Sequence, residues 1–144
     1  MSVNPSLSRE QFEHLIPHSG SMVLIDTVEY WIETAIKCST LSHQNPANPL
    51  RMEGQLAGVH LLEYGAQVMA IHGGLLTGIA VPGYLAAVRA AHFYIDNLDD
   101  VKEKLVIEAY AELKIKNGAV YQFNVTDSCG QLLLEARATV INTL

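Results

Sequence analysis

The sequence predicts an α+β fold in which an antiparallel sheet wraps around one long central helix. Residues 54–76 are nearly all apolar or small, which is typical of a helix that is buried on most sides. The segments that follow alternate apolar and polar residues and are separated by turn sequences, as antiparallel strands are. A sheet that encloses the helix explains why the helix is apolar over most of its surface.

The N-terminal half is expected to supply a short helix, a hairpin and a loop. Ser8 followed by Gln11 is the pattern of a capping box, so we expect a short helix that buries Phe12. Residues 22–42 are rich in β-branched and aromatic side chains, which predicts one long bent strand or a hairpin. Residues 43–54 contain prolines and glycine and are expected to form a loop.

The C-terminal half is expected to supply the long helix and a meander of strands. Gly73, Gly74 and Gly78, together with the break at Val81-Pro82-Gly83, are expected to mark the end of the helix. Strands are predicted over residues 84–95, 105–116, 120–127 and 131–142. Asn117 and Gly118 form the predicted two-residue turn of a hairpin. Strict alternation would place Leu113 on the apolar face of its strand.

Composition and charge exclude several classes of protein. The length of 144 residues predicts a single domain, 1–144, that can bury a core. A net charge of −6 without a basic run argues against nucleic-acid binding. The N-terminus lacks the pattern of a signal peptide, and polar residues such as His60 and Glu63 interrupt the apolar helix, so we expect no membrane span and a cytoplasmic location. Cys38 and Cys129 lack metal or redox spacing and are expected to be free thiols.

Three polar residues share one face of the apolar helix. His60, Glu63 and Gln67 fall within about 60° of one another at 100° per residue. A buried carboxylate costs several kcal/mol unless it is paired or hydrogen-bonded. Glu63 is therefore expected to belong either to a structural network or to a functional site. His72 lies about 180° from Glu63 and is expected in the core.

Three segments of the sequence look like motifs of one known enzyme family. Residues 15–28, LIPHSGSMVLIDTV, look like the family's opening pattern of Leu-Pro-His, a short loop and an apolar strand. Residues 58–67, GVHLLEYGAQ, are similar to the helix motif Gly-Val-x-x-x-Glu-x-x-Ala-Gln. The spacing from residues 89–93 through 105–108 to the end looks like the C-terminal meander. Together these segments resemble the hotdog-fold 3-hydroxyacyl-ACP dehydratases of the FabZ and FabA type. The chain looks like a divergent branch of them, similar to hotdog proteins of aryl-polyene and related lipid pathways that are predicted dehydratases.

The resemblance implies a set of site residues on the central helix. Glu63 matches the acidic residue of the family, and Gln67 matches a glutamine that braces the site. Gly58 and Val59 open the helix motif, where backbone N–H groups can polarise a thioester carbonyl. These four residues are therefore expected to be catalytic or to support the substrate.

The chain departs from the family in the loop before the helix. Such dehydratases carry His-Phe-Pro-Gly there, and its histidine is the catalytic base, but the equivalent position here is Pro49. His43 lies in the same loop, so we expect it to approach Glu63 of the partner subunit, directly or through one water. His60 is expected to orient its own Glu63, and His18 to anchor its loop. If His43 lies elsewhere, either His60 or His18 takes the role of the base, or the site has no histidine base.

Dehydration of a 3-hydroxyacyl thioester needs a base for the C2 proton and an acid for the leaving hydroxyl. The resemblance therefore predicts a 3-hydroxyacyl-ACP dehydratase of fatty-acid or polyene-type lipid synthesis. It needs no metal or other cofactor, takes an acyl carrier protein or CoA thioester, and forms a homodimer or higher oligomer. Two alternatives stay open: an acyl-ACP or acyl-CoA thioesterase, whose acid residue activates water, and a catalytically weak acyl-binding subunit that pairs with an active partner.

Overall fold

A computed structural model describes residues 4–80 and 83–142 of the chain. The strands are β1 Leu7–Ser8, β2 Thr27–Ile32, β3 Ala35–Thr40, β4 Gly83–Phe93, β5 Leu105–Ile115, β6 Gly118–Asp127 and β7 Leu132–Asn142. The helices are α1 Arg9–Phe12 and α2 Leu61–Thr77, with 3₁₀ turns η1 Glu13–Leu15, η2 Gly20–Met22, η3 Ser42–Gln44, η4 Gly58–His60 and η5 Leu98–Asp100.

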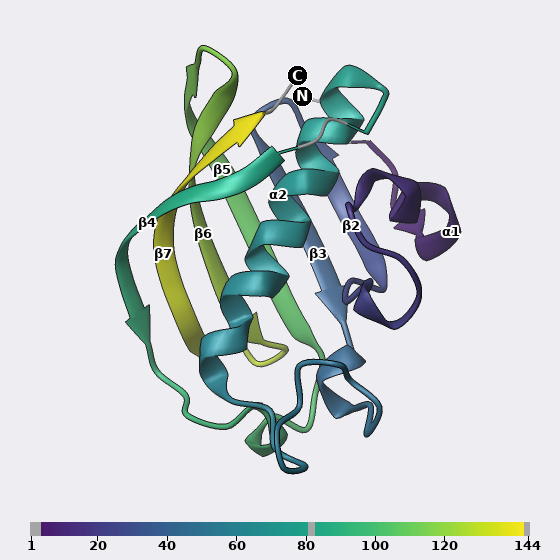
Figure 1. The fold of residues 1–144 in the computed structure, drawn as a ribbon, viewed down its shortest axis with the longest axis vertical. Coiled ribbons are helices and arrows are strands. Elements are labelled where there is room, and N and C mark those ends of the chain that lie inside the picture. Colours follow the sequence, from purple (N-terminus) through teal and green to yellow (C-terminus); the bar gives the residue numbers. More distant parts are fainter. Residues whose placement is uncertain (1–3, 81–82, 143–144) are drawn as a thin grey trace.

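The strands form one antiparallel sheet that curls around α2 (Figure 1). Their order is β1-β2-β3-β5-β6-β7-β4. One side of α2 packs into the concave face of the sheet, and its inward residues Leu61, Tyr64, Val68 and Ile71 are fully buried. The predicted hotdog α+β fold is confirmed. None of the helices within residues 4–80 and 83–142 has the length and hydropathy of a membrane span.

The N-terminal elements agree with the sequence prediction. The side-chain oxygen of Gln11 accepts a hydrogen bond from the backbone N–H of Ser8 at 2.9 Å, which is one half of the capping box. Phe12 is fully buried. Of the two alternatives for residues 22–42, the hairpin is confirmed, because β2 and β3 pair from Ile32 and Ala35 outward.

The central helix begins later than the sequence indicated and ends at one of the glycines that were predicted to mark its end. Residues 54–57 are not helical, and a 3₁₀ turn precedes the first residue of α2. The helix then continues through Gly73 and Gly74 and stops at Gly78, which adopts a φ of 81° and donates its N–H to the carbonyl of Gly74. Of the predicted end markers Gly78 is confirmed, because its left-handed conformation terminates the helix. Gly73 and Gly74 lie inside the helix instead of ending it, because helical glycine is destabilising without being a stop. Val81 and Pro82, which were also predicted to mark the end, lie outside the described residues.

The β5–β6 hairpin corrects two further predictions. Gly118 already pairs with Ile115, so the two-residue loop is Lys116–Asn117, one position earlier than predicted. Asn117 takes a φ of 62°, which asparagine tolerates better than most residues. A register shift just before Leu113 interrupts the alternation, and this side chain is 58% exposed instead of facing the core.

Candidate active site

A cavity of about 660 Å³ runs along one face of α2. Its other walls come from β4, the β5–β6 hairpin and β7. The helix contributes a row of mostly small or apolar residues at helical spacing: Leu62, Ala66, Met69, Ala70, Gly73, Gly74, Leu76 and Thr77. The apolar character of α2 therefore serves two surfaces, the core of the sheet on one side and this cavity on the other.

Glu63 and His18 meet at the end of this cavity that lies nearest the start of α2. The Nε2 atom of His18 lies 3.2 Å from Oε1 of Glu63, and both residues line the cavity. Their side chains are 38% and 33% exposed. Glu63 is therefore not the buried carboxylate that the helix pattern predicted, because the cavity replaces protein on this side. We call these two residues the His18–Glu63 pair.

Gln67 connects the helix to the segment that carries His18. Its side-chain oxygen accepts the backbone N–H of Leu24 at 2.8 Å, and its side-chain nitrogen donates to the carbonyl of Met22 at 2.6 Å. The same nitrogen lies 3.4 Å from Oε1 of Glu63. Gln67 is 1% exposed, so these contacts hold it in one orientation. This arrangement explains how a loop distant in sequence is held beside the carboxylate.

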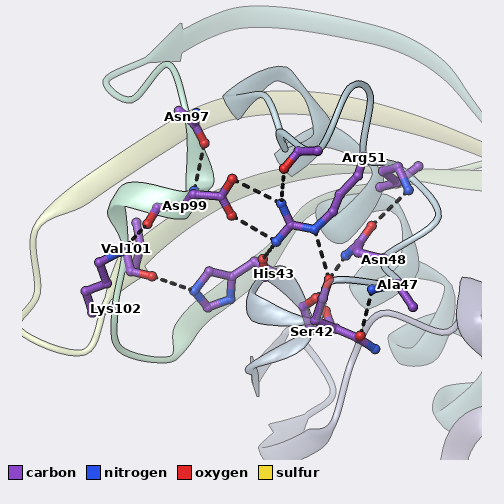
Figure 2. A network of polar contacts seen from close by, with 12 residues as sticks. Ser42, His43, Ala47, Asn48, Arg51, Asn97, Asp99, Val101 and Lys102 are labelled. Atoms are coloured by element: carbon purple, nitrogen blue, oxygen red, sulfur yellow. Dashed lines mark hydrogen bonds and ion pairs between the residues drawn. The ribbon is translucent and has the colours of Figure 1, made fainter.

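His43 occupies a different environment, shown in Figure 2. Its side chain is fully buried, and its Nε2 lies 3.1 Å from the carbonyl oxygen of Val101, to which it donates as the neutral ring. Burial lowers the pKa of His43 below its ordinary value. Its Nδ1 has no hydrogen-bond partner within the described part of the chain. The expected approach to Glu63 of the partner subunit involves a second chain and stays a prediction.

Arg51 ties the loop before α2 to η5. Two guanidinium nitrogens bind both carboxylate oxygens of Asp99 at 3.0 and 2.8 Å, and further bonds reach the carbonyls of Asn45, His43 and Gly54 (Figure 2). Arg51 also lowers the pKa of Asp99. The Arg51 side chain is 11% exposed. We call His43, Arg51 and Asp99 the loop network, whose contacts hold loop backbone in place.

The start of the helix motif is held by packing contacts. The N–H of Gly58 donates to the carbonyl of Asp96 at 2.7 Å, and a Cβ atom at position 58 would lie 2.1 Å from the carbonyl oxygen of Ile95. Only glycine fits there. Val59 is 54% exposed, and His60 lies in the 3₁₀ turn before α2, whereas Glu63 makes its polar contacts with His18 and Gln67. Substrate roles for residues 58–60 stay predictions.

The His18–Glu63 pair can move protons at the edge of a largely apolar space. An imidazole and a carboxylate 3.2 Å apart can exchange a proton directly. Because both side chains line the cavity, either can also reach a ligand inside it. Within the described ranges no group of three or more His, Cys, Asp or Glu side chains gathers as a metal site would.

Comparison with known protein families places the chain. Residues 10–143 match the model of the ApeP-like family, described as ApeP dehydratase. The chain belongs to the ApeP-like family. This membership confirms the predicted resemblance to hotdog dehydratases of aryl-polyene-type pathways. A comparison with curated protein sequences finds no match.

Several solved structures share the fold of this chain. The dehydratase heterocomplex ApeI:P from Xenorhabdus doucetiae matches with a TM-score of 0.77 and 19% identity, over 92% of this chain and 91% of that chain. The PaaI protein of the E. coli phenylacetic acid degradation operon matches with a TM-score of 0.58 and 14% identity, over 79% of this chain and 80% of that chain. A hypothetical thioesterase from Streptococcus pneumoniae TIGR4 with coenzyme A matches with a TM-score of 0.57 and 15% identity, over 81% of this chain and 84% of that chain. At these identities the likenesses show the hotdog fold alone.

Proposed function

We propose that this ApeP-like protein dehydrates 3-hydroxyacyl thioesters and that the His18–Glu63 pair carries out the proton transfers. The observation that carries the proposal is the 3.2 Å contact between an imidazole and a carboxylate that both line one cavity. Membership of a dehydratase family supports the reaction class. The apolar walls along α2 suit an acyl chain, which would place the thioester end near Glu63.

The proposed reaction starts with one proton on the His18–Glu63 pair, so that one member is protonated and the other is not. The unprotonated member takes the C2 proton, and the electrons of the broken C–H bond form the C2–C3 double bond. The C3–O bond breaks, and the protonated member gives its proton to the departing oxygen, which leaves as water. Direct proton transfer across the 3.2 Å contact then restores the starting state. Gln67 acts as a positioning residue, because it contacts Glu63 and holds the loop at Met22 and Leu24.

His18 takes the place that the sequence pattern assigned to His43. The proposal that His43 reacts would require its ring to leave a fully buried position and its hydrogen bond to the carbonyl of Val101. His18 needs no such rearrangement, since it already contacts Glu63 beside the cavity. These contacts favour His18 as the histidine of the site.

We further propose that the protein pairs with a second hotdog chain along β4. This strand stands at one end of the strand order, so within the described residues one of its edges has no neighbouring strand. Tyr84 and Phe93 on β4 are 54% and 38% exposed. A homodimer in the cytoplasm that takes its substrate from an acyl carrier protein or CoA is the simplest arrangement. Light scattering tests it, with a species of twice 15.8 kDa expected; a monomer at micromolar concentration would contradict it.

One assay separates the proposed function from its alternatives. The purified protein is given a 3-hydroxyacyl thioester, and the mixture is followed for enoyl thioester, free thiol and bound substrate. Enoyl product supports the dehydratase. Release of free acid and thiol would instead indicate a thioesterase, and binding without either product would indicate an acyl-binding partner subunit. Either of these results would overturn the proposal.

A further inference from the structure

Three glycines lie inside α2, and packing explains two of them. A Cβ atom at Gly65 would lie 2.3 Å from the ring of Phe123, and one at Gly74 would lie 2.8 Å from a methyl carbon of Leu15. Packing against these side chains therefore favours glycine at both positions. A Cβ atom at Gly73 would meet nothing within 4 Å. Because glycine weakens a helix interior relative to alanine, its presence at position 73 needs another explanation.

The position of Gly73 on the helix supplies that explanation. Gly73 lines the cavity, and so do Ala70 one turn before it and Thr77 one turn after it. Since residues three or four apart share one helix face, a side chain at position 73 would point into the cavity. Helix termination does not account for this glycine, because α2 ends at Gly78.

We infer that Gly73 determines the length of acyl chain that the cavity accepts, by leaving open a passage that any side chain would narrow. The inference rests on the proposed function only in taking the ligand to be an acyl thioester. At 1.5 Å per residue, Gly73 lies about 15 Å along the helix from Glu63, close to the length of an extended chain of about ten to twelve carbons. The cavity continues beyond it to Thr77. Chains longer than this pass Gly73, and shorter chains end before it.

The test is Gly73→Leu, which adds bulk only in the open space. The variant is expected to fold, because leucine is a better helix former than glycine and its Cβ atom meets no neighbour. Binding is measured by calorimetry with saturated acyl-N-acetylcysteamine thioesters from about four to about sixteen carbons, and turnover with the matching 3-hydroxyacyl thioesters. We expect the longest chains to bind at least about tenfold more weakly, and the shortest within about twofold of the unmodified protein.

Two control variants make the result specific. Gly73→Ala is expected to narrow the passage less and to shift the length preference in the same direction by a smaller factor. Gly65 does not line the cavity, and a Cβ atom there would collide with the ring of Phe123, so Gly65→Ala should lower the melting temperature and leave the preference for chain length unchanged.

The outcomes separate this inference from the proposed function. An unchanged length profile in a folded Gly73→Leu variant would overturn the inference even if the protein is a dehydratase. Failure of the unmodified protein to bind any of the thioesters would overturn it as well. Length-dependent binding that Gly73→Leu truncates, without formation of enoyl product, would support the inference while the dehydratase proposal fails.

Discussion

The His18–Glu63 pair and the loop network both combine a histidine with a carboxylate, and they differ in what surrounds them. Arg51 of the loop network is 11% exposed, and its guanidinium N–H groups donate hydrogen bonds to Asp99 and to three backbone carbonyls. The His18–Glu63 pair is about one-third exposed and borders a cavity. A polar cluster whose donors bind backbone carbonyls and a carboxylate of the same cluster holds the fold together, whereas an accessible pair beside a cavity is available to a ligand. The proposed function therefore relies on access to a cavity and not on location in the expected loop.

The largest expected effect follows from Glu63→Gln. Glutamine keeps the volume of the side chain and can still bind His18, but it cannot transfer a proton. We expect turnover to fall by about 10²–10⁴-fold, the usual contribution of acid–base catalysis. Steady-state kinetics on a 3-hydroxyacyl thioester would measure this, with circular dichroism as the check on folding. If the folded variant keeps most of its activity, Glu63 is structural.

A smaller effect, on stability instead of turnover, is expected for Arg51→Ala. Removing the guanidinium leaves the Asp99 carboxylate and three loop carbonyls without their donors. We expect the free energy of unfolding to fall by about 2–3 kcal/mol, measured by urea denaturation. Activity per folded molecule should stay within about threefold of the unmodified protein on this account. A folded variant that loses catalysis would show that the loop network is part of the site.

The smallest effect is a pH dependence of stability that the loop network contributes. Burial lowers the pKa of His43 below its ordinary value of 6.5. As the pH falls, this histidine is therefore protonated at a higher pH in the unfolded chain than in the folded protein. His43 therefore contributes stability that is complete above about pH 6.5 and is lost as the pH falls toward the folded-state pKa. His72 has its pKa lowered by burial and adds to the same trend. The free energy of unfolding is measured by chemical denaturation at about pH 7.5 and at about pH 5.5. Between these two pH values it should fall less for His43→Asn than for the unmodified protein, and an equal fall in both proteins would contradict this.

Much of the fold follows from local pattern. The capping box and the meander were predicted, and a hairpin was one of the two alternatives for residues 22–42, because each of these features depends on residues close together in the sequence. The start of α2 was not, because it depends on a distant contact: Gly58 donates to Asp96, and the residues after it form a 3₁₀ turn before the helix. The prediction that Leu113 faces the core rested on strict alternation, and it failed for a similar reason. The β-bulge that interrupts the alternation depends on the curvature of the whole sheet.

The candidate site was predictable in part. The family resemblance singled out Glu63 and Gln67. In the structure both residues line the cavity, and their side chains are in contact with each other. The contact between His18 and Glu63 was not predicted, because it depends on hydrogen bonds of Gln67 to Met22 and Leu24 that leave no periodic pattern. The Pro-His of the opening motif was the available indication, and it did not specify what His18 would contact.

The most direct test compares His18→Asn with His43→Asn on one 3-hydroxyacyl thioester, with turnover expressed per folded molecule. On this account His18→Asn loses at least about 10²-fold in kcat/KM with an unchanged midpoint of urea unfolding, because it removes a proton-transfer group from the cavity. His43→Asn lowers the midpoint, because it disturbs a buried hydrogen bond, and keeps its catalysis. The reverse result, with catalysis lost in folded His43→Asn and kept in His18→Asn, would contradict the assignment of the His18–Glu63 pair as the reacting groups.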